Sequence, residues 1–236
     1  GKQVAAWDVF NEADCQPRIN KHGRNVKMIK IVRELRDQYS PQADVIISGQ
    51  STTCFNWFKG ILDAGAAEDL DGIAWHPYRM LAPEIPESNA YAGSKTGMCT
   101  LLSSLQELRE LLVGAGVEAS IHLNEWNYAL NLQPQYDDND QVNFMVRSTI
   151  LAWTTGYVKN LCLHAFGNGR LSPPAYPNMA WHMIDTTFKK RCEAGHPEVY
   201  AFAFEKSDGR VVVPAWTSKT DRTISVKGLS GRPEVR

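Results

Sequence analysis

Hydrophobic and polar positions alternate along the chain in a pattern that predicts strands and helices in turn. Short apolar runs, typical of buried strands, are each followed by a longer stretch with apolar residues at helical spacing. The expected strands are Gln3–Phe10, Asp44–Ser48, Gly72–His76, Ala119–Asn124 and Val158–Ala165. The expected helices are Asn25–Tyr39, Cys54–Ala64, a segment with Leu101, Leu105, Leu108 and Leu112 in register, Asp140–Thr154 and Asn178–Lys190. This βα alternation predicts a parallel sheet with helices packed outside it.

Two of the predicted helices carry more detailed expectations. In the first, one face is apolar and is expected to pack on the sheet, at the spacing that a 3.6-residue period requires. Its members are Met28, Ile31, Val32, Leu35 and Tyr39. In the fourth helix, Asp140 is expected to cap the first turn. A polar loop rich in Pro, Gly and Ser, Arg79–Thr96, precedes the helix that contains Leu101.

From Glu198 onward the pattern becomes that of short strands joined by tight turns. Three strand-like runs follow one another: Val199–Phe204, Arg210–Trp216 and Thr223–Lys227. The segments between them, Ser207-Asp208-Gly209 and Lys219-Thr220-Asp221, are typical of turns. We therefore expect an α/β region over residues 1–195 and part of an antiparallel β-sandwich over residues 196–236.

Composition and the lack of nucleotide motifs narrow the class of protein. Hydrophobic residues make up 43% and charged residues 22% of the chain, as in ordinary globular domains. The net charge of -1 gives no electrostatic reason to expect nucleic acid or a membrane as a partner. Neither a Gly-x-Gly-x-x-Gly motif nor a Gly-Lys-Ser/Thr loop occurs, which favours a closed barrel over a doubly wound nucleotide-binding sheet. The 5 cysteines lack Cys-x-x-Cys spacing, which argues against a zinc site, and the cellular compartment stays open, secretion or the periplasm included.

Two Asn-Glu pairs lie where predicted strands end. The first is in Trp7-Asp8-Val9-Phe10-Asn11-Glu12-Ala13, and the second is in Ile121-His122-Leu123-Asn124-Glu125-Trp126-Asn127. Side chains at the carboxyl ends of parallel strands line the active sites of α/β enzymes. Two carboxylates at such a rim suit glycosidic bond cleavage, in which one protonates the departing oxygen and the other attacks the anomeric carbon or activates water. The alternative is two unrelated surface glutamates, since Asn-Glu is a common dipeptide; the aromatic residues beside both pairs favour the paired interpretation.

These segments, with Ala74-Trp75-His76-Pro77-Tyr78 between them, resemble the strand ends of the clan A retaining glycoside hydrolases. The resemblance implies a (β/α)8 TIM barrel in which these segments end strands four, six and seven. Within the clan, the family of β-xylosidases and α-iduronidases, which carries an appended β-sandwich, is the most similar. By this resemblance Glu12 is the general acid/base, Glu125 the nucleophile and Asn11 the partner of the sugar 2-hydroxyl.

The two catalytic roles require different surroundings. Glu12 must hold a proton before cleavage, whereas Glu125 must stay ionised by accepting hydrogen bonds. Either Tyr78 or His76 is expected to donate to Glu125. For His76 a second interpretation stays open, a core histidine that is satisfied by a backbone carbonyl.

Other candidate substrate contacts follow from residue type and place. Trp126 and Trp75 either stack on a sugar ring or pack in the core, and Gln50 and Asn127 could hydrogen-bond hydroxyls. Asp8 lies four positions before Glu12, so if Glu12 faces the mouth of the barrel, the alternation of side chains along the strand points Asp8 inward as well. There we expect it to pair with an arginine.

The resemblance also implies that the chain is part of a longer protein. If Gln3–Phe10 is strand four, the chain holds only the C-terminal five βα units of the barrel, and the missing N-terminal half is its expected partner. The expected substrate is a glycoside, oligosaccharide or polysaccharide, with no cofactor and no metal. Two other classes stay in view: a carbohydrate-binding protein without turnover, and a metal-dependent barrel enzyme. The second is disfavoured because His-x-His and His-x-x-x-His are absent from the sequence.

Overall fold

The computed structural model describes residues 4–16, 18, 21–50, 54–86, 99–118, 120–128, 135–164, 175–219 and 223. The chain divides into two compact units, Gly1–Pro173 and Pro174–Arg236, which are described separately. Within the described ranges, every helix is too short or too polar to cross a membrane.

The first unit is built on parallel strands that pair in the order of the sequence. Its strands are β1 (Ala6–Asp8), β2 (Asp44–Ile46), β3 (Ser48–Gln50), β4 (Gly72–His76), β5 (Ser120–Trp126) and β6 (Val158–Leu163). Strand β1 pairs with β2, and β3, β4, β5 and β6 form a second parallel sheet in that order. The expected strand Asp44–Ser48 is interrupted at Ile47, so its first part pairs with β1 and its continuation with β4. The predicted parallel α/β organisation is confirmed.

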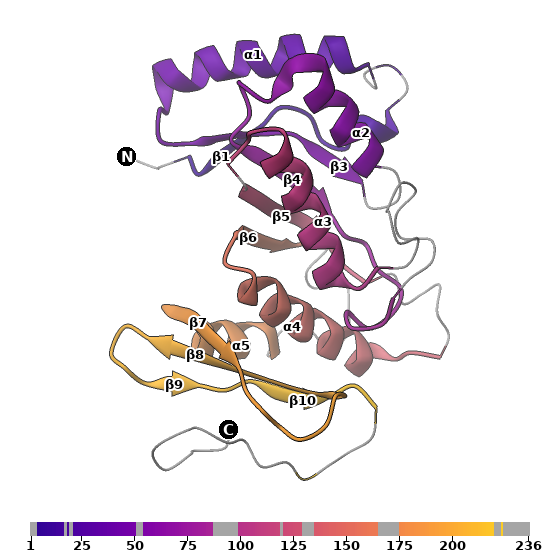
Figure 1. The fold of residues 1–236 in the computed structure, drawn as a ribbon, viewed down its shortest axis with the longest axis vertical. Coiled ribbons are helices and arrows are strands. Elements are labelled where there is room, and N and C mark those ends of the chain that lie inside the picture. Colours follow the sequence, from indigo (N-terminus) through magenta and orange to yellow (C-terminus); the bar gives the residue numbers. More distant parts are fainter. Residues whose placement is uncertain are drawn as a thin grey trace. The chain divides into compact units, whose positions relative to one another are not determined.

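Helices fill the connections between these strands, as the sequence predicts. They are α1 (His22–Tyr39), α2 (Cys54–Ile61), α3 (Leu101–Gly114) and α4 (Asp138–Thr154), with short turns η1 (Ala13–Cys15) and η2 (Leu62–Ala66). Figure 1 shows α1, α2, α3 and α4 succeeding one another alongside the succession of strands. Phe58, Ile73, Leu105, Leu108 and Ile121 are buried between the two layers. The regular leucine spacing in α3 therefore correctly identifies its inner face.

The apolar face expected for α1 is wrong for most of its members. Ile31, Leu35 and Tyr39 are exposed, Tyr39 by 68%. The residues that α1 buries are Asn25, Ile29 and Arg36, so the buried face is rotated around the helix from the predicted one.

Arg36 accounts for the rotated buried face of α1. This charged residue is buried because its guanidinium has hydrogen-bond acceptors there. Its guanidinium donates to Asp71 Oδ2 at 3.3 Å and to the Pro41 carbonyl at 2.9 Å. Arg33 donates to the other oxygen of Asp71 at 2.8 Å, and the Val45 amide donates to Oδ2 at 2.9 Å. A carboxylate that accepts from two arginines and a strand amide fixes α1 against β2, and hydrophobic spacing alone cannot reveal such an anchor.

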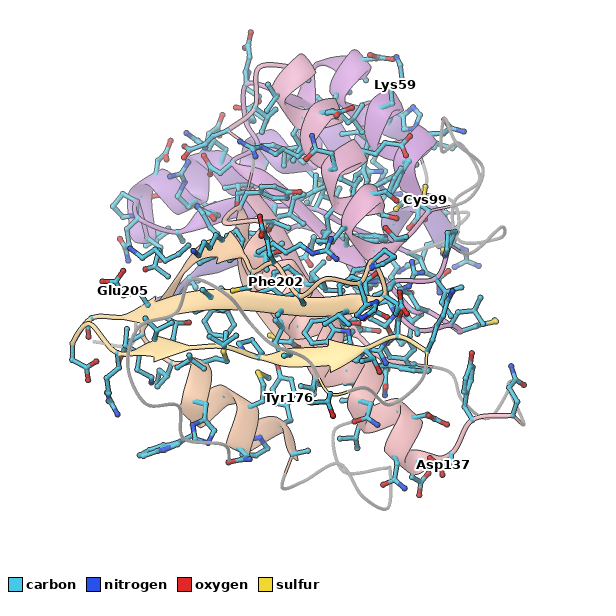
Figure 2. All side chains as sticks on the ribbon, turned by 60° about the horizontal axis from the view of Figure 1, so that its bottom comes forward. Lys59, Cys99, Asp137, Tyr176, Phe202 and Glu205 are labelled. Atoms are coloured by element: carbon cyan, nitrogen blue, oxygen red, sulfur yellow. The ribbon has the colours of Figure 1, made fainter. Side chains whose placement is uncertain are left out.

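The N-terminal cap of α4 is Asp137 rather than the expected Asp140. The Asp137 carboxylate accepts from the amides of Asn139 at 2.8 Å and Asp140 at 3.0 Å, and Asp140 accepts from the Asp137 amide at 3.0 Å. This reciprocal pair is a capping box, and Figure 2 labels Asp137 where the helix begins. The prediction of a carboxylate cap holds, but three aspartates within four positions, 137–140, make it hard to tell from the sequence which one supplies it.

The second unit pairs its strands antiparallel. It contains α5 (Ala175–Met183), β7 (Thr186–Arg191), β8 (Val199–Lys206), β9 (Val211–Val212) and β10 (Ala215–Thr217). Strand β8 is central and pairs with β7, β9 and β10. Figure 2 labels Phe202 along β8 and Glu205 toward its end.

The expected helix Asn178–Lys190 is wrong beyond Met183. Asp185 has a left-handed backbone (φ 58), which ends the helix, and Thr186, Thr187 and Phe188 then extend into a strand. β-branched and aromatic residues favour that conformation. Since β7 pairs with β8, the antiparallel sheet begins before residue 195.

The remaining expectations for this unit have mixed outcomes. The turn at Ser207-Asp208-Gly209 is confirmed, with Gly209 at φ 82 between β8 and β9. The expected strand Arg210–Trp216 is two strands, β9 and β10, separated at Val213 and Pro214, because proline has no amide hydrogen for a strand ladder. The expected strand Thr223–Lys227 and most of the turn before it lie outside the described residues.

Candidate active site

Glu12 lies in a turn that follows β1 and opens η1. Its backbone is left-handed (φ 47, ψ 50). For a residue with a side chain this conformation costs roughly 1–3 kcal/mol and is found where surrounding contacts enforce it, often at functional sites. Backbone hydrogen bonds hold the segment before it, from Val9 to Ile46 at 3.0 Å and from Ser48 to Phe10 at 3.3 Å. The sheet therefore fixes the turn that carries the Glu12 carboxylate.

Glu125 reaches the same place from β5. It is the next-to-last residue of that strand, and the neighbouring strand β4 ends at His76. One side-chain oxygen of Glu12, one of Glu125 and one ring nitrogen of His76 all lie within 4.8 Å of one another. The two glutamates that the sequence analysis paired are thus brought together at the carboxyl ends of parallel strands.

Glu125 is surrounded by hydrogen-bond donors. The Tyr78 hydroxyl donates to Glu125 Oε1 at 2.6 Å, and His164 Nδ1 lies 3.4 Å from the same oxygen and contacts the Tyr78 hydroxyl as well. Burial, and then the hydrogen bond to Glu125, raise the pKa of Tyr78 above its usual value. The phenol therefore keeps its proton and donates it toward Glu125, which favours the ionised carboxylate.

Glu12 has a different partner, the imidazole of His76. His76 Nδ1 lies 3.0 Å from Glu12 Oε1, and His76 Nε2 lies 3.0 Å from Asn124 Oδ1. The ring is 0% exposed. Its hydrogen-bond partners among the described residues are therefore the side chains of Glu12 and Asn124, rather than Glu125 or a backbone carbonyl.

The network continues from Asn124 to β1. Asn124 Nδ2 donates to Asp8 Oδ2 at 2.9 Å, and the Ser48 hydroxyl donates to the same oxygen. Among the described residues, the hydrogen-bond donors to Asp8 are Ser48 and Asn124 rather than the expected arginine. A continuous path of side chains therefore connects Glu12, His76, Asn124, Asp8 and Ser48.

The other expected substrate contacts are placed differently. Trp126 is 2% exposed and packs edge-on against Tyr128 in the core, and Trp75 is buried too. The Asn127 side-chain amide bonds to neighbouring backbone. It donates to the His164 carbonyl at 2.9 Å, and its oxygen accepts from the Tyr128 backbone N–H at 2.7 Å.

Asn11 directly precedes Glu12, and Gln50 contacts η1, the short turn that follows Glu12. Asn11 is exposed in the turn that carries Glu12. Gln50 ends β3. Its backbone N–H donates to Asp14 Oδ1 at 3.0 Å, and its side-chain oxygen accepts from the Cys15 thiol at 2.8 Å. Gln50 therefore ties β3 to η1, beside the glutamate.

Two site residues are missing from the sequence prediction, His164 and Asn124. His164 follows directly after β6, and the rule that strand ends line such sites could have indicated it. Asn124 was read only as part of the motif, because its role depends on Asp8 across the sheet, which no local pattern shows.

Glu12, His76 and Glu125 are the one set of described residues with the spacing of a metal site. His76 Nδ1 and Glu12 Oε1 face each other at hydrogen-bond distance, and Nε2 already faces Asn124. This pattern is that of groups that can share a proton.

Comparison with known proteins relates this geometry to solved structures. A family 39 glycoside hydrolase from Bacteroides cellulosilyticus WH2 matches 90% of this chain with a TM-score of 0.65 and 17% identity. The GH51 α-L-arabinofuranosidase of Thermotoga petrophila RKU-1 matches 90% with a TM-score of 0.59 and 16% identity. The α-L-arabinofuranosidase of Thermotoga maritima matches 89% with a TM-score of 0.59 and 15% identity. The chain shares the fold of these glycoside hydrolases.

The match covers only part of each relative. This chain spans 47% of the Bacteroides structure and 51% of each Thermotoga structure. No family model matches the sequence, and no curated protein matches it. The likeness is therefore one of fold, and the reaction has to be argued from the site.

Proposed function

We propose that this chain belongs to a retaining glycoside hydrolase, with Glu12 as the general acid/base and Glu125 as the nucleophile. The observation that carries the proposal is that two carboxylates from two strand ends lie close together and have different hydrogen-bond partners. Glu125 faces the Tyr78 donor, and Glu12 faces the His76 ring. Such a difference is what separate acid and nucleophile roles need.

The chemistry would run in two displacements. Glu125 attacks the anomeric carbon while Glu12 passes its proton to the departing oxygen, which leaves a covalent glycosyl-enzyme. Glu12, now a carboxylate, takes a proton from water, and the resulting hydroxide displaces Glu125 from the sugar. Both steps need the two carboxylates on one mouth, with Glu125 ionised at the start.

The separation of the carboxylates supports retention over inversion. Retaining enzymes hold the two groups about 5–5.5 Å apart, whereas inverting enzymes need about 6.5–9.5 Å to admit a water between them. One side-chain oxygen of Glu12 lies within 4.8 Å of one of Glu125, and this close approach favours the shorter separation of retaining enzymes. The expected substrate is a glycoside, and Asn11, exposed beside Glu12, is the proposed partner of the sugar 2-hydroxyl.

We further propose that the parallel strands belong to a (β/α)8 barrel and that residues 196–236 belong to a β-sandwich. The order of strand pairing supports the first assignment, as do the helices that connect β1 to β2, β3 to β4, β4 to β5 and β5 to β6. The antiparallel sheet around β8 supports the second.

The test uses the full-length protein that carries this chain, screened on aryl glycosides. Glu125→Ala should abolish turnover, and azide should restore it with product of inverted configuration, since the anion attacks from the vacated face. Glu12→Ala should spare substrates with good leaving groups, whose departure needs little protonation. The matched control is Glu34→Ala, on the exposed side of α1, which should leave turnover unchanged.

Three results would decide against the proposal. Equal loss on all substrates in both glutamate variants would refute the division of roles. Inverted product from the unmodified enzyme would refute retention. Saturable sugar binding without turnover would instead support a carbohydrate-binding protein.

A further inference from the structure

The His76 ring sits between two side chains whose polarity differs, and this decides where its proton lies. A neutral imidazole has one nitrogen that donates and one that accepts, and which is which follows from the partners. His76 Nδ1 faces Glu12 and Nε2 faces Asn124, each at 3.0 Å. The state of the ring can therefore be worked out by following the chain of hydrogen bonds from its far end.

The far end is the Asp8 carboxylate on β1. Its Oδ2 accepts from the Ser48 hydroxyl and from Asn124 Nδ2, the latter at 2.9 Å. Burial raises the pKa of Asp8, but the hydrogen bonds from Ser48 and Asn124 act in the opposite direction and favour the carboxylate, an acceptor, so the Asn124 side-chain amide turns its NH2 group toward Asp8. The opposite end of the same amide, Oδ1, then points at His76.

Asn124 Oδ1 can only accept, so His76 Nε2 must carry a hydrogen and donate it. In the neutral ring Nδ1 is then bare and is an acceptor. The proton in the 3.0 Å contact between Nδ1 and Glu12 Oε1 is therefore a single one, held by the carboxylic acid or passed to the ring.

We propose that Asp8 and Asn124 are positioning residues that hold one His76 proton on Nε2, so that the bare Nδ1 and the Glu12 carboxyl group share a single proton between them. This inference rests on the proposed role of Glu12. The opposite tautomer would present an Nδ1–H group to Glu12, which stabilises the ionised carboxylate. That is the wrong state for the first step, in which Glu12 must donate.

The second displacement is also served by this arrangement. Once Glu12 has given up its proton, the bare nitrogen cannot donate to the carboxylate, so the carboxylate remains free to take a proton from water. The other charged and titratable groups described at this mouth are Glu125, within 4.8 Å of the Glu12 and His76 atoms, and Tyr78 and His164, which contact Glu125 and each other.

The test is the tautomer of His76, read by long-range ¹H–¹⁵N correlation in the full-length protein labelled with ¹⁵N-histidine. The ring signals are assigned by their loss in His76→Gln. In the unmodified protein at neutral pH we expect the hydrogen on Nε2. An Nδ1–H tautomer there would overturn the proposal without any variant being needed.

Asp8→Asn then tests the positioning. An amide at position 8 can accept or donate, so it no longer dictates the orientation of Asn124, and the ring should become a mixture of tautomers. The matched control is Asp44→Asn, because Asp44 is also a strand carboxylate that contacts a histidine, His122, at 3.1 Å. The control should leave the His76 signals unchanged; an unaltered tautomer in folded Asp8→Asn would overturn the proposal.

Kinetics supply a second readout and separate this inference from the proposed function. Asp8→Asn should lower kcat/KM at least about tenfold on glycosides with poor leaving groups and much less on activated ones, since it impairs the acid. An equal loss on both classes would contradict the positioning role. If the unmodified protein has the Nε2–H tautomer yet cleaves no glycoside, the proposed function fails while the tautomer assignment stands.

Discussion

Replacing Tyr78 by Phe removes the hydroxyl group that donates to Glu125. The hydroxyl donates to Glu125 Oε1 over 2.6 Å, a short bond of the kind formed with a charged acceptor. Hydrogen bonds to charged groups contribute about 1.5–3 kcal/mol, and about 1.4 kcal/mol corresponds to a tenfold change in rate. If Glu125 is the nucleophile, Tyr78→Phe should therefore lower kcat/KM by roughly 10- to 100-fold, with the protein still folded.

The assay is hydrolysis of aryl glycosides by the full-length protein, with thermal unfolding measured in parallel. Tyr128→Phe is the matched control, because the Tyr128 hydroxyl also forms a buried 2.6 Å hydrogen bond, but with Ser148 instead of Glu125. That variant should lose about 1 kcal/mol of stability and keep its activity. The reasoning would be refuted if Tyr78→Phe stayed within twofold of the unmodified enzyme, or if the two variants lost activity equally.

The strand ends that form the site could be predicted from the sequence, because an apolar run and the Asn-Glu pair that ends it are both local features. An apolar run that ends in Asn-Glu places a carboxylate at the rim of a parallel sheet, and the structure has Glu12 and Glu125 at neighbouring places on that rim. The same rule covers His76 and Tyr78, at and after the end of β4. Local patterns do not say which partner each group takes, which is why His76 was expected beside Glu125.

Two wrong predictions concern the buried face of α1 and the end of α5. In both places a charged or polar residue determines the structure, and the spacing of hydrophobic residues does not show it. The buried face of α1 follows Arg36, whose partner Asp71 lies in a loop far along the chain. The end of α5 follows the left-handed Asp185, after which pairing with β8 outweighs helix propensity. In each case tertiary contacts overrode a weak local preference, as expected when helix propensities amount to tenths of a kcal/mol per residue.

Three further predictions concern stability. Asp71→Ala should cost about 2–3 kcal/mol in urea unfolding, because it strands the buried Arg36 guanidinium, whereas Asp63→Ala, which breaks only an exposed pair, should cost under about 0.5 kcal/mol. Asp137→Ala should cost about 1 kcal/mol by removing the cap of α4, and an unchanged urea midpoint would contradict the capping box. The third concerns pH: burial lowers the pKa of His122 below its usual value, so the unfolded chain takes up a proton more readily than the folded one. Burial alone would raise the pKa of Asp44 beside it, but the hydrogen bond and charge of Lys159, together with His122, lower it. Since the stability from a lowered histidine pKa is present above about pH 6.5 and that from a lowered aspartate pKa above about pH 3.8, both are lost on acidification. The free energy of unfolding should therefore begin to fall below about pH 6.5 and fall further near pH 4, and His122→Gln should flatten the first part of this curve; a stability that rose between pH 7 and pH 5 would contradict the assignment.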